Sequence, residues 1–161
     1  MSRAGGEEVF EIFIDGSSRG NPGHAGCGVV IKDAQGIVLL EEGYSLGEMT
    51  NNSAEYSALI VALEQALVLR AESVRVYADS ELLVRQMNGQ YRVKHKDLKL
   101  LHARAGQLAS RLKAFSIEHV GREDNRDADR LAQQASGKSA KRAKSHGQSL
   151  TKPSHTQDKL F

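Results

Sequence analysis

The chain has 161 residues, of which 40% are hydrophobic, and a formal net charge of +2 at pH 7. This length is typical of one domain and supplies enough apolar residues for a single core. The one cysteine excludes an intramolecular disulfide, and no apolar run is long enough to span a membrane. The N-terminus lacks the basic and apolar regions of a signal peptide, so we expect a monomeric cytoplasmic protein with no membrane partner.

Charge is unevenly distributed along the chain. Residues 137–161 contain six Lys or Arg and one Asp, whereas the rest of the chain contains 16 Lys or Arg and 19 Asp or Glu. Hydrophobic periodicity also stops after Ser136, and polar residues dominate from there onward. We therefore predict a flexible segment at residues 1–8, a folded domain at 9–136 and a disordered basic tail at 137–161.

The hydrophobic pattern predicts nine elements. Short turns separate the first three strands, which is typical of an antiparallel meander. Apolar residues then recur at helical spacing, and strands alternate with helices to the end of the domain. The predicted strands are residues 9–14, 26–33, 37–44, 74–78 and 115–120, and the predicted helices are 54–70, 80–87, 97–112 and one from residue 124. The order β-β-β-α-β-α-α-β-α predicts an α/β fold with a mixed sheet covered by helices.

Four acidic residues stand at predicted element boundaries. Asp15 and Asp79 each follow a strand, and ligands of open α/β sheets bind at the carboxyl ends of strands. Glu55 and Asp129 fall in the predicted first turns of helices, where the helix dipole favours negative charge. Taken singly, each acid has a structural explanation as a turn or helix cap, and residues 52–55 resemble a capping box.

Taken together, the four acids indicate a metal site. Clustered carboxylates repel one another unless a cation neutralises them. Mg²⁺ prefers oxygen ligands and leaves positions open for phosphate and water. Two such ions about 4 Å apart activate a water molecule and stabilise the leaving oxygen of a phosphodiester. Ca²⁺ also accepts carboxylates, but the chain contains no EF-hand spacing.

Four segments around these acids resemble the motifs of ribonuclease HI, and the resemblance extends from about Phe10 to Ala135. It implies a ribonuclease H fold with a five-stranded mixed sheet and helices on both faces. It also implies an endonuclease that hydrolyses the RNA strand of RNA–DNA hybrids, leaving 5′-phosphate and 3′-hydroxyl ends, with Mg²⁺ or alternatively Mn²⁺. Asp15, Glu55, Asp79 and Asp129 are then the catalytic, metal-binding acids. The four segments are residues 13–23, 50–55, 77–80 and 125–132.

The resemblance also indicates substrate contacts. Asn21, Thr50 and Asn52 match positions that contact the nucleic-acid backbone in the family, and Ser80 and Arg122 are further candidates. Turn chemistry is a second explanation for the Asn-Pro-Gly sequence that begins at Asn21. Distinguishing RNA from DNA requires contacts to the 2′-hydroxyl.

Two departures place the chain near the handle-less bacterial and archaeal branch of the family. The basic, Trp-containing protrusion is missing, and basic residues before and within the predicted long helix are candidates for part of its positive surface, although such runs also form solvated helix faces. The catalytic loop has no histidine, and the nearest residue is Arg122, which stays charged and suits a phosphate better than proton transfer. The basic candidates, with one histidine, are Arg92, Lys94, His95, Lys96 and Lys99.

Two alternatives to a hybrid-specific nuclease remain open. One is a nuclease that also cuts double-stranded RNA, since the A-like geometry is shared. The other is a hybrid-binding module with weak or no turnover, although a binder has no need for four unneutralised acids.

The chain ends in the peptide Gln-Asp-Lys-Leu-Phe at residues 157–161. It resembles the Gln-x-x-Leu-Phe motif by which bacterial replication and repair proteins bind the DNA polymerase sliding clamp. Leu160 and Phe161 are adjacent apolar anchors, and Gln157 can hydrogen-bond at the rim of a pocket. Chance occurrence of so short a motif is the alternative. We predict the sliding clamp as a partner, which implies a role in DNA replication.

Overall fold

The computed structural model describes residues 8–137. Its element order matches the predicted order, with one addition, a short 3-10 helix (η1) at Arg122–Asp124. No helix in this part of the chain is long and apolar enough to cross a membrane. The strands are β1 (Val9–Ser18), β2 (Gly23–Lys32), β3 (Val38–Met49), β4 (Ser73–Ala78) and β5 (Ala114–His119), and the helices are α1 (Asn51–Val68), α2 (Glu81–Met87), α3 (Lys96–Ala109) and α4 (Arg126–Ala135).

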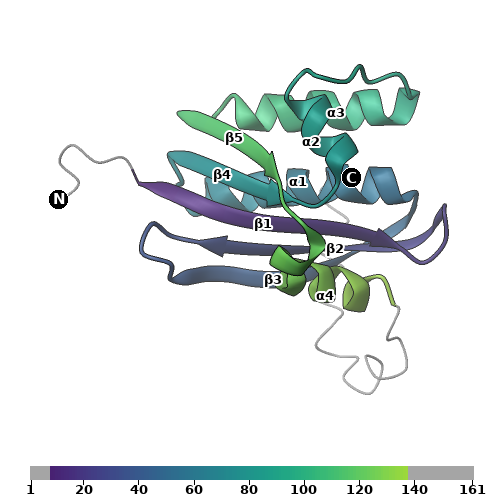
Figure 1. Cartoon of the computed structure of the whole chain (residues 1–161), viewed down its shortest axis with the longest axis horizontal. Coiled ribbons are helices and arrows are strands. Elements are labelled where there is room, and N and C mark those ends of the chain that lie inside the picture. The colour runs from purple at the N-terminus through teal and green to yellow at the C-terminus, as the bar shows by residue number, and fades with distance from the viewer. Residues whose placement is uncertain (1–7, 138–161) are drawn as a thin grey trace.

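The five strands form one mixed sheet in the order β3-β2-β1-β4-β5 (Figure 1). Strands β1, β2 and β3 pair in antiparallel fashion, whereas β4 is parallel to both β1 and β5. The predicted mixed sheet is therefore confirmed. Because β1 and β4 are parallel neighbours, their carboxyl ends meet at the same edge of the sheet.

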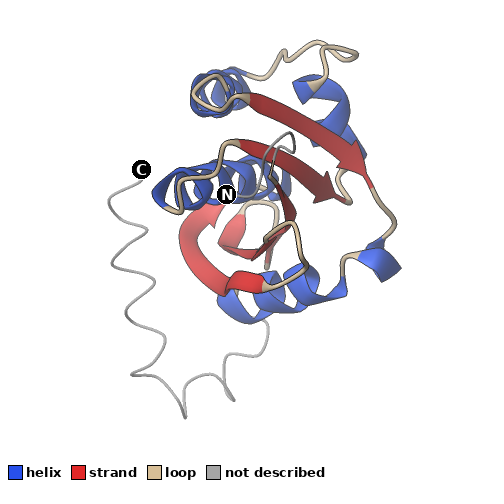
Figure 2. Ribbon diagram, turned by 90° about the vertical axis from the view of Figure 1, so that its left-hand side faces the viewer, coloured by secondary structure: helices blue, strands red, loops and turns tan. Residues whose placement is uncertain are grey.

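Helices cover both faces of this sheet (Figure 2). Side chains alternate between the two faces along a strand, and two glycines show which helix lies on each face. A Cβ atom at Gly16 of β1 would collide with the backbone of α1, and one at Gly28 of β2 would collide with the backbone of α4. Both glycines are needed because these helices lie directly on the strands. Helix α3 packs against α1.

The main core lies between the sheet and α1. Most of α1 is buried, because α1 is enclosed by the sheet on one side and by α3 on the other. Leu59 and Leu63 of α1 are fully buried, as are Ile12 and Ile14 of β1 and Val76 of β4. Truncation of such a leucine to alanine costs about 2–5 kcal/mol of stability. The helical periodicity predicted from the sequence thus corresponds to this buried face.

Several predicted boundaries differ from the structure, and two of these differences, in β1 and α1, concern the site. Strand β1 does not end at Ile14 but continues to Ser18, because its last four residues pair with β2. Asp15 therefore lies within the strand. Helix α1 begins at Asn51, and the cap is Thr50, whose Oγ1 accepts a hydrogen bond from the Ser53 amide at 3.1 Å. The predicted capping box at residues 52–55 is absent because those residues are already helical.

Candidate active site

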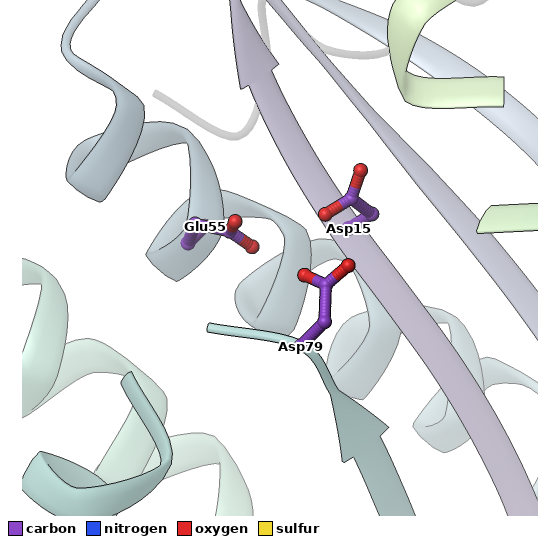
Figure 3. A group of neighbouring side chains, drawn as sticks. All are labelled: Asp15, Glu55 and Asp79. Carbon is purple, nitrogen blue, oxygen red and sulfur yellow. The ribbon is translucent and has the colours of Figure 1, made fainter. Parts of the chain in front are cut away.

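Three acidic side chains converge at the carboxyl ends of β1 and β4 (Figure 3). Asp15 comes from β1, Glu55 from α1, and Asp79 from the position directly after β4. One carboxylate oxygen of each residue lies within 4.8 Å of the others. Residues far apart in the sequence are brought together because the parallel pairing of β1 and β4 aligns them and α1 packs directly against β1 at Gly16.

Glu55 is held in place by the strand beneath it. Its Oε1 accepts a hydrogen bond from the Gly16 amide at 3.1 Å. This contact depends on glycine, because any Cβ at Gly16 would push α1 away. Since α1 begins at Asn51, Glu55 lies beyond the first helical turn, contrary to the predicted dipole position.

Asp129 lies beside this group of three. It falls in the first turn of α4, as predicted. Both of its carboxylate oxygens accept hydrogen bonds from Gln133 Nε2, at 3.1 and 3.2 Å. Among residues 8–137, the set of acids whose oxygens all lie close enough to share one ion is Asp15, Glu55 and Asp79. The structure thus brings three of the predicted acids into one cluster and places the fourth next to Asp15.

The cluster holds protons tightly when no cation is present. Burial raises the pKa of Asp15 to about 10, with further contributions from repulsion by Glu55 and Asp79 and from a hydrogen bond with Asp129. Burial and repulsion by Asp79 raise the pKa of Glu55 to about 8. An ordinary carboxyl group has a pKa near 4. A positive charge at this position would therefore displace protons and relieve the repulsion.

The donor set fits a hard divalent cation. The three groups offer only carboxylate oxygens, which Mg²⁺ and Mn²⁺ accept. Asp79 Oδ2 is buried and has no hydrogen-bond partner within the described residues. A buried acceptor without a donor is costly, and a bound cation would satisfy it. The described residues thus fit a metal site.

Arg122 approaches the cluster from η1. Its side chain is 77% exposed, and its Nε lies 3.9 Å from Asp79 Oδ2. Its positive charge acts to lower the pKa of Glu55, against the effect of burial. His119, as expected, is still in a strand. Arg122 is therefore the basic side chain of this loop that is paired with a cluster acid.

The other predicted substrate residues lie in the turn after β1 and at the starts of α1 and α2, and three of them make structural hydrogen bonds. Asn21 Oδ1 accepts a hydrogen bond from the Asn51 amide at 3.0 Å, Thr50 caps α1, and Ser80 caps α2 through the Leu83 amide at 3.2 Å. Asn52 is exposed on the first turn of α1. Gln157, Leu160 and Phe161 lie outside the described residues.

Sequence reasoning missed two asparagines near the site. Asn51 Oδ1 accepts a hydrogen bond from the Ser18 amide at 2.9 Å and so joins the start of α1 to the end of β1. Asn125 is 2% exposed and donates a hydrogen bond to the backbone of β1. Both residues stand inside the four motif segments, but only the fold shows which strand they contact.

Comparisons with known proteins agree with this fold and site. Residues 13–135 match the protein family described as reverse transcriptase-like. A bifunctional protein of Mycobacterium tuberculosis is 45% identical over 133 residues, which cover 82% of this chain and 36% of the relative. Ribonuclease HI of Halobacterium salinarum is 40% identical over 123 residues, which cover 76% of this chain and 62% of the relative. The chain thus spans about a third of the length of the mycobacterial relative and less than two thirds of the length of the Halobacterium relative.

Solved structures give the same result. Ribonuclease H1 of Halobacterium salinarum superimposes with a TM-score of 0.77 at 38% identity, covering 79% of this chain and 96% of that one. The N-terminal ribonuclease H domain of the mycobacterial protein gives 0.79 at 44% identity, with 84% and 98% covered. LC11-RNase H1, isolated from compost and solved with an RNA/DNA hybrid, gives 0.75 at 42% identity, with 81% and 99% covered. The chain therefore belongs to the ribonuclease H-like family.

Proposed function

We propose that this chain is a ribonuclease H, an endonuclease that hydrolyses the RNA strand of RNA–DNA hybrids and leaves 5′-phosphate and 3′-hydroxyl ends. The observation that carries the proposal is the convergence of Asp15, Glu55 and Asp79 at the ends of two parallel strands. The names of two similar proteins, one a ribonuclease HI and one solved with an RNA/DNA hybrid, support it.

The proposed cofactor is Mg²⁺ or Mn²⁺, in two copies held by Asp15, Glu55, Asp79 and Asp129. When bound, such ions supply an activated water molecule and stabilise the leaving oxygen. The raised pKa values of Asp15 and Glu55 describe the metal-free cluster, and both groups would lose their protons on metal binding because a carboxylate ligand must be deprotonated. Gln133 holds the Asp129 carboxylate in a fixed orientation.

We propose that polar residues near the cluster contact the nucleic-acid backbone of the substrate. Arg122 stands beside Asp79 with most of its side chain in solvent, so it can exchange that partner for a phosphate oxygen. Asn52 is exposed at the N-terminus of α1, where backbone amides and the helix dipole favour phosphate. Asn21, Thr50 and Ser80 are further proposed substrate contacts, and their hydrogen bonds to backbone amides hold their side chains at the starts of α1 and α2.

The segment after α2 supplies the proposed positive surface. Arg92 and Lys94 are exposed and, with Leu82, Gln90 and Tyr91, line a shallow cavity of about 450 Å³. Lys96 and Lys99 continue the exposed basic residues into α3. His95 Nδ1 instead caps α3 by accepting a hydrogen bond from the Asp97 amide at 3.2 Å.

The test is a cleavage assay with Mg²⁺ or Mn²⁺ on three substrates of matched sequence, an RNA–DNA hybrid, duplex RNA and duplex DNA. We expect cleavage of the RNA strand of the hybrid and none of duplex DNA. Cleavage of duplex RNA would extend the substrate range. Binding of the hybrid without cleavage under either metal would refute the enzymatic proposal and favour a binding module.

We also propose, from the sequence of the tail alone, that the peptide at residues 157–161 binds the DNA polymerase sliding clamp. Attachment to the clamp through this peptide would raise the local concentration of the nuclease near primer RNA. Under this proposal the protein acts in the cytoplasm, as a monomer, in DNA replication. The test compares binding of purified clamp by the full chain and by a chain that ends at Thr156. Equal binding by both, or none by either, would refute it.

A further inference from the structure

Asn125 is a buried polar residue with no part in the proposed chemistry. It precedes the first residue of α4, and its Nδ2 donates a hydrogen bond of 2.8 Å to the backbone carbonyl of Ile14 on β1. An asparagine at this position ordinarily caps its helix with the side-chain oxygen. Here the side chain makes no capping hydrogen bond. The side-chain amide of Asn125 therefore forms its hydrogen bond with the sheet rather than with its own helix.

The acceptor lies at a particular point of the sheet. The ladder between β1 and β4 ends at the pair Ile14 and Ala78. The next residues of the two segments are Asp15 and Asp79, the acids of the cluster. The Ile14 carbonyl belongs to the peptide group that leads into Asp15. Asn125 thus bonds to the backbone directly before an acid of the cluster, where the pairing of the parallel strands stops.

Two candidate site residues flank Asn125 along the chain. The backbone N–H of Asn125 donates to the Arg122 carbonyl at 3.0 Å, so Arg122 stands one 3-10 turn before Asn125. The Asp129 amide donates to the Asn125 carbonyl at 3.0 Å, so Asp129 stands one helical turn after it. The side-chain hydrogen bond of Asn125 therefore ties the segment that carries both residues to β1.

Packing of α4 on the sheet does not replace this bond. Gly28, which pairs with Asp15, allows the α4 backbone to approach β2 closely. That contact sets the distance between helix and sheet, but it is not directional. A hydrogen bond weakens steeply when its angle or length changes, so the Asn125 bond also fixes the position of α4 along β1.

We propose, on the basis of the proposed function, that Asn125 is a positioning residue: its hydrogen bond to the Ile14 carbonyl sets where Asp129 and Arg122 stand relative to Asp15. Residues that orient metal ligands without touching the metal affect affinity or activity by about 10- to 100-fold. Asn125 acts through Asp129 on metal affinity and through Arg122 on the substrate.

The experiment compares Asn125→Ala with a matched control, Asn88→Ala. Asn88 Nδ2 donates to the backbone carbonyl of Ile117 on β5 at 3.2 Å, so the control removes the same type of bond from the same sheet, away from the cluster. Mn²⁺ binding is measured by calorimetry, and hybrid cleavage is measured at saturating Mn²⁺. We expect Asn125→Ala to bind Mn²⁺ about 10- to 100-fold more weakly and Asn88→Ala to bind it as the wild type does.

A double variant separates positioning from general loosening of the fold. In the Asp129→Asn background, Asn125→Ala should cause little further loss of Mn²⁺ affinity, because Asp129 no longer needs to be positioned. A full additional loss would overturn the proposal, as would unchanged affinity in folded Asn125→Ala or an equal loss in Asn88→Ala. If Asn125→Ala does not fold, Asn125→Ser takes its place in the same comparisons. Absence of Mn²⁺ binding by the wild type would refute the proposed function itself, and this proposal with it.

Discussion

Replacement of Asp15 by asparagine should change how the stability of the metal-free protein depends on pH. Burial raises the pKa of Asp15 to about 10, whereas the unfolded chain has an ordinary value near 4. Between these values the folded state holds one proton that the unfolded state has lost, so its free energy of unfolding falls as the pH rises. One such proton corresponds to about 1.4 kcal/mol per pH unit. The Asp15→Asn variant has no titrating proton at this position, so this contribution disappears.

The assay is urea unfolding of both proteins in EDTA between roughly pH 5.5 and pH 7.5, a range that lies between the unfolded and folded pKa values of Asp15. The difference in unfolding free energy should grow in favour of Asp15→Asn by about 1.4 kcal/mol per pH unit. Asp127→Asn is the control for loss of one carboxylate, because this exposed side chain lies outside the cluster. If the free energies of unfolding of wild type and Asp15→Asn changed in parallel with pH, the inference that folded Asp15 keeps its proton in this range would be refuted.

Three further predictions concern catalysis and packing. Asp79→Asn should abolish hybrid cleavage at saturating Mg²⁺ with an unchanged circular dichroism spectrum, and near-normal turnover would contradict the metal assignment. Arg122→Ala should raise KM while kcat stays similar in steady-state kinetics, because the proposed contact that it removes is to a phosphate of the bound substrate. An unchanged KM would show that Arg122 does not contact the substrate. Gly16→Ala should lower the free energy of unfolding by about 1–3 kcal/mol, since its Cβ collides with α1. Gly106→Ala, on an open helix position, should instead raise it by about 0.5–1 kcal/mol, and equal effects of both glycine variants in urea unfolding would show that the collision is relieved.

The order of elements and the acids themselves could be predicted because both depend on local patterns. The spacing of Leu59 and Leu63 indicates a helix from local sequence alone, without knowledge of distant segments. Motifs around Asp15 and Asp79 identify candidate ligands without knowledge of their distance. The structure adds that these side chains converge with Glu55.

Features that depend on pairing between distant segments could not be predicted. The extension of β1 to Ser18 requires β2 as a partner, so glycine and serine residues that resemble a loop in sequence form a strand. The bond from Asn125 to Ile14 spans 111 positions of the chain. The predicted start of α1 is wrong because Thr50 and Asn52 both suit a cap, and the choice between them depends on how α1 meets the sheet.

The parallel pairing of β1 and β4 has a consequence for folding. The antiparallel meander of β1, β2 and β3 is built from contacts between neighbouring segments, but it contains Asp15 alone of the three clustered acids. Glu55 and Asp79 join it only after α1 has crossed the sheet and β4 has added beside β1, a non-local step that closes a long loop. A partly folded chain therefore lacks the complete set of ligands. Divalent cations would bind the native state and not its precursors, so they would stabilise the whole domain increasingly as their concentration rises rather than guide its early assembly.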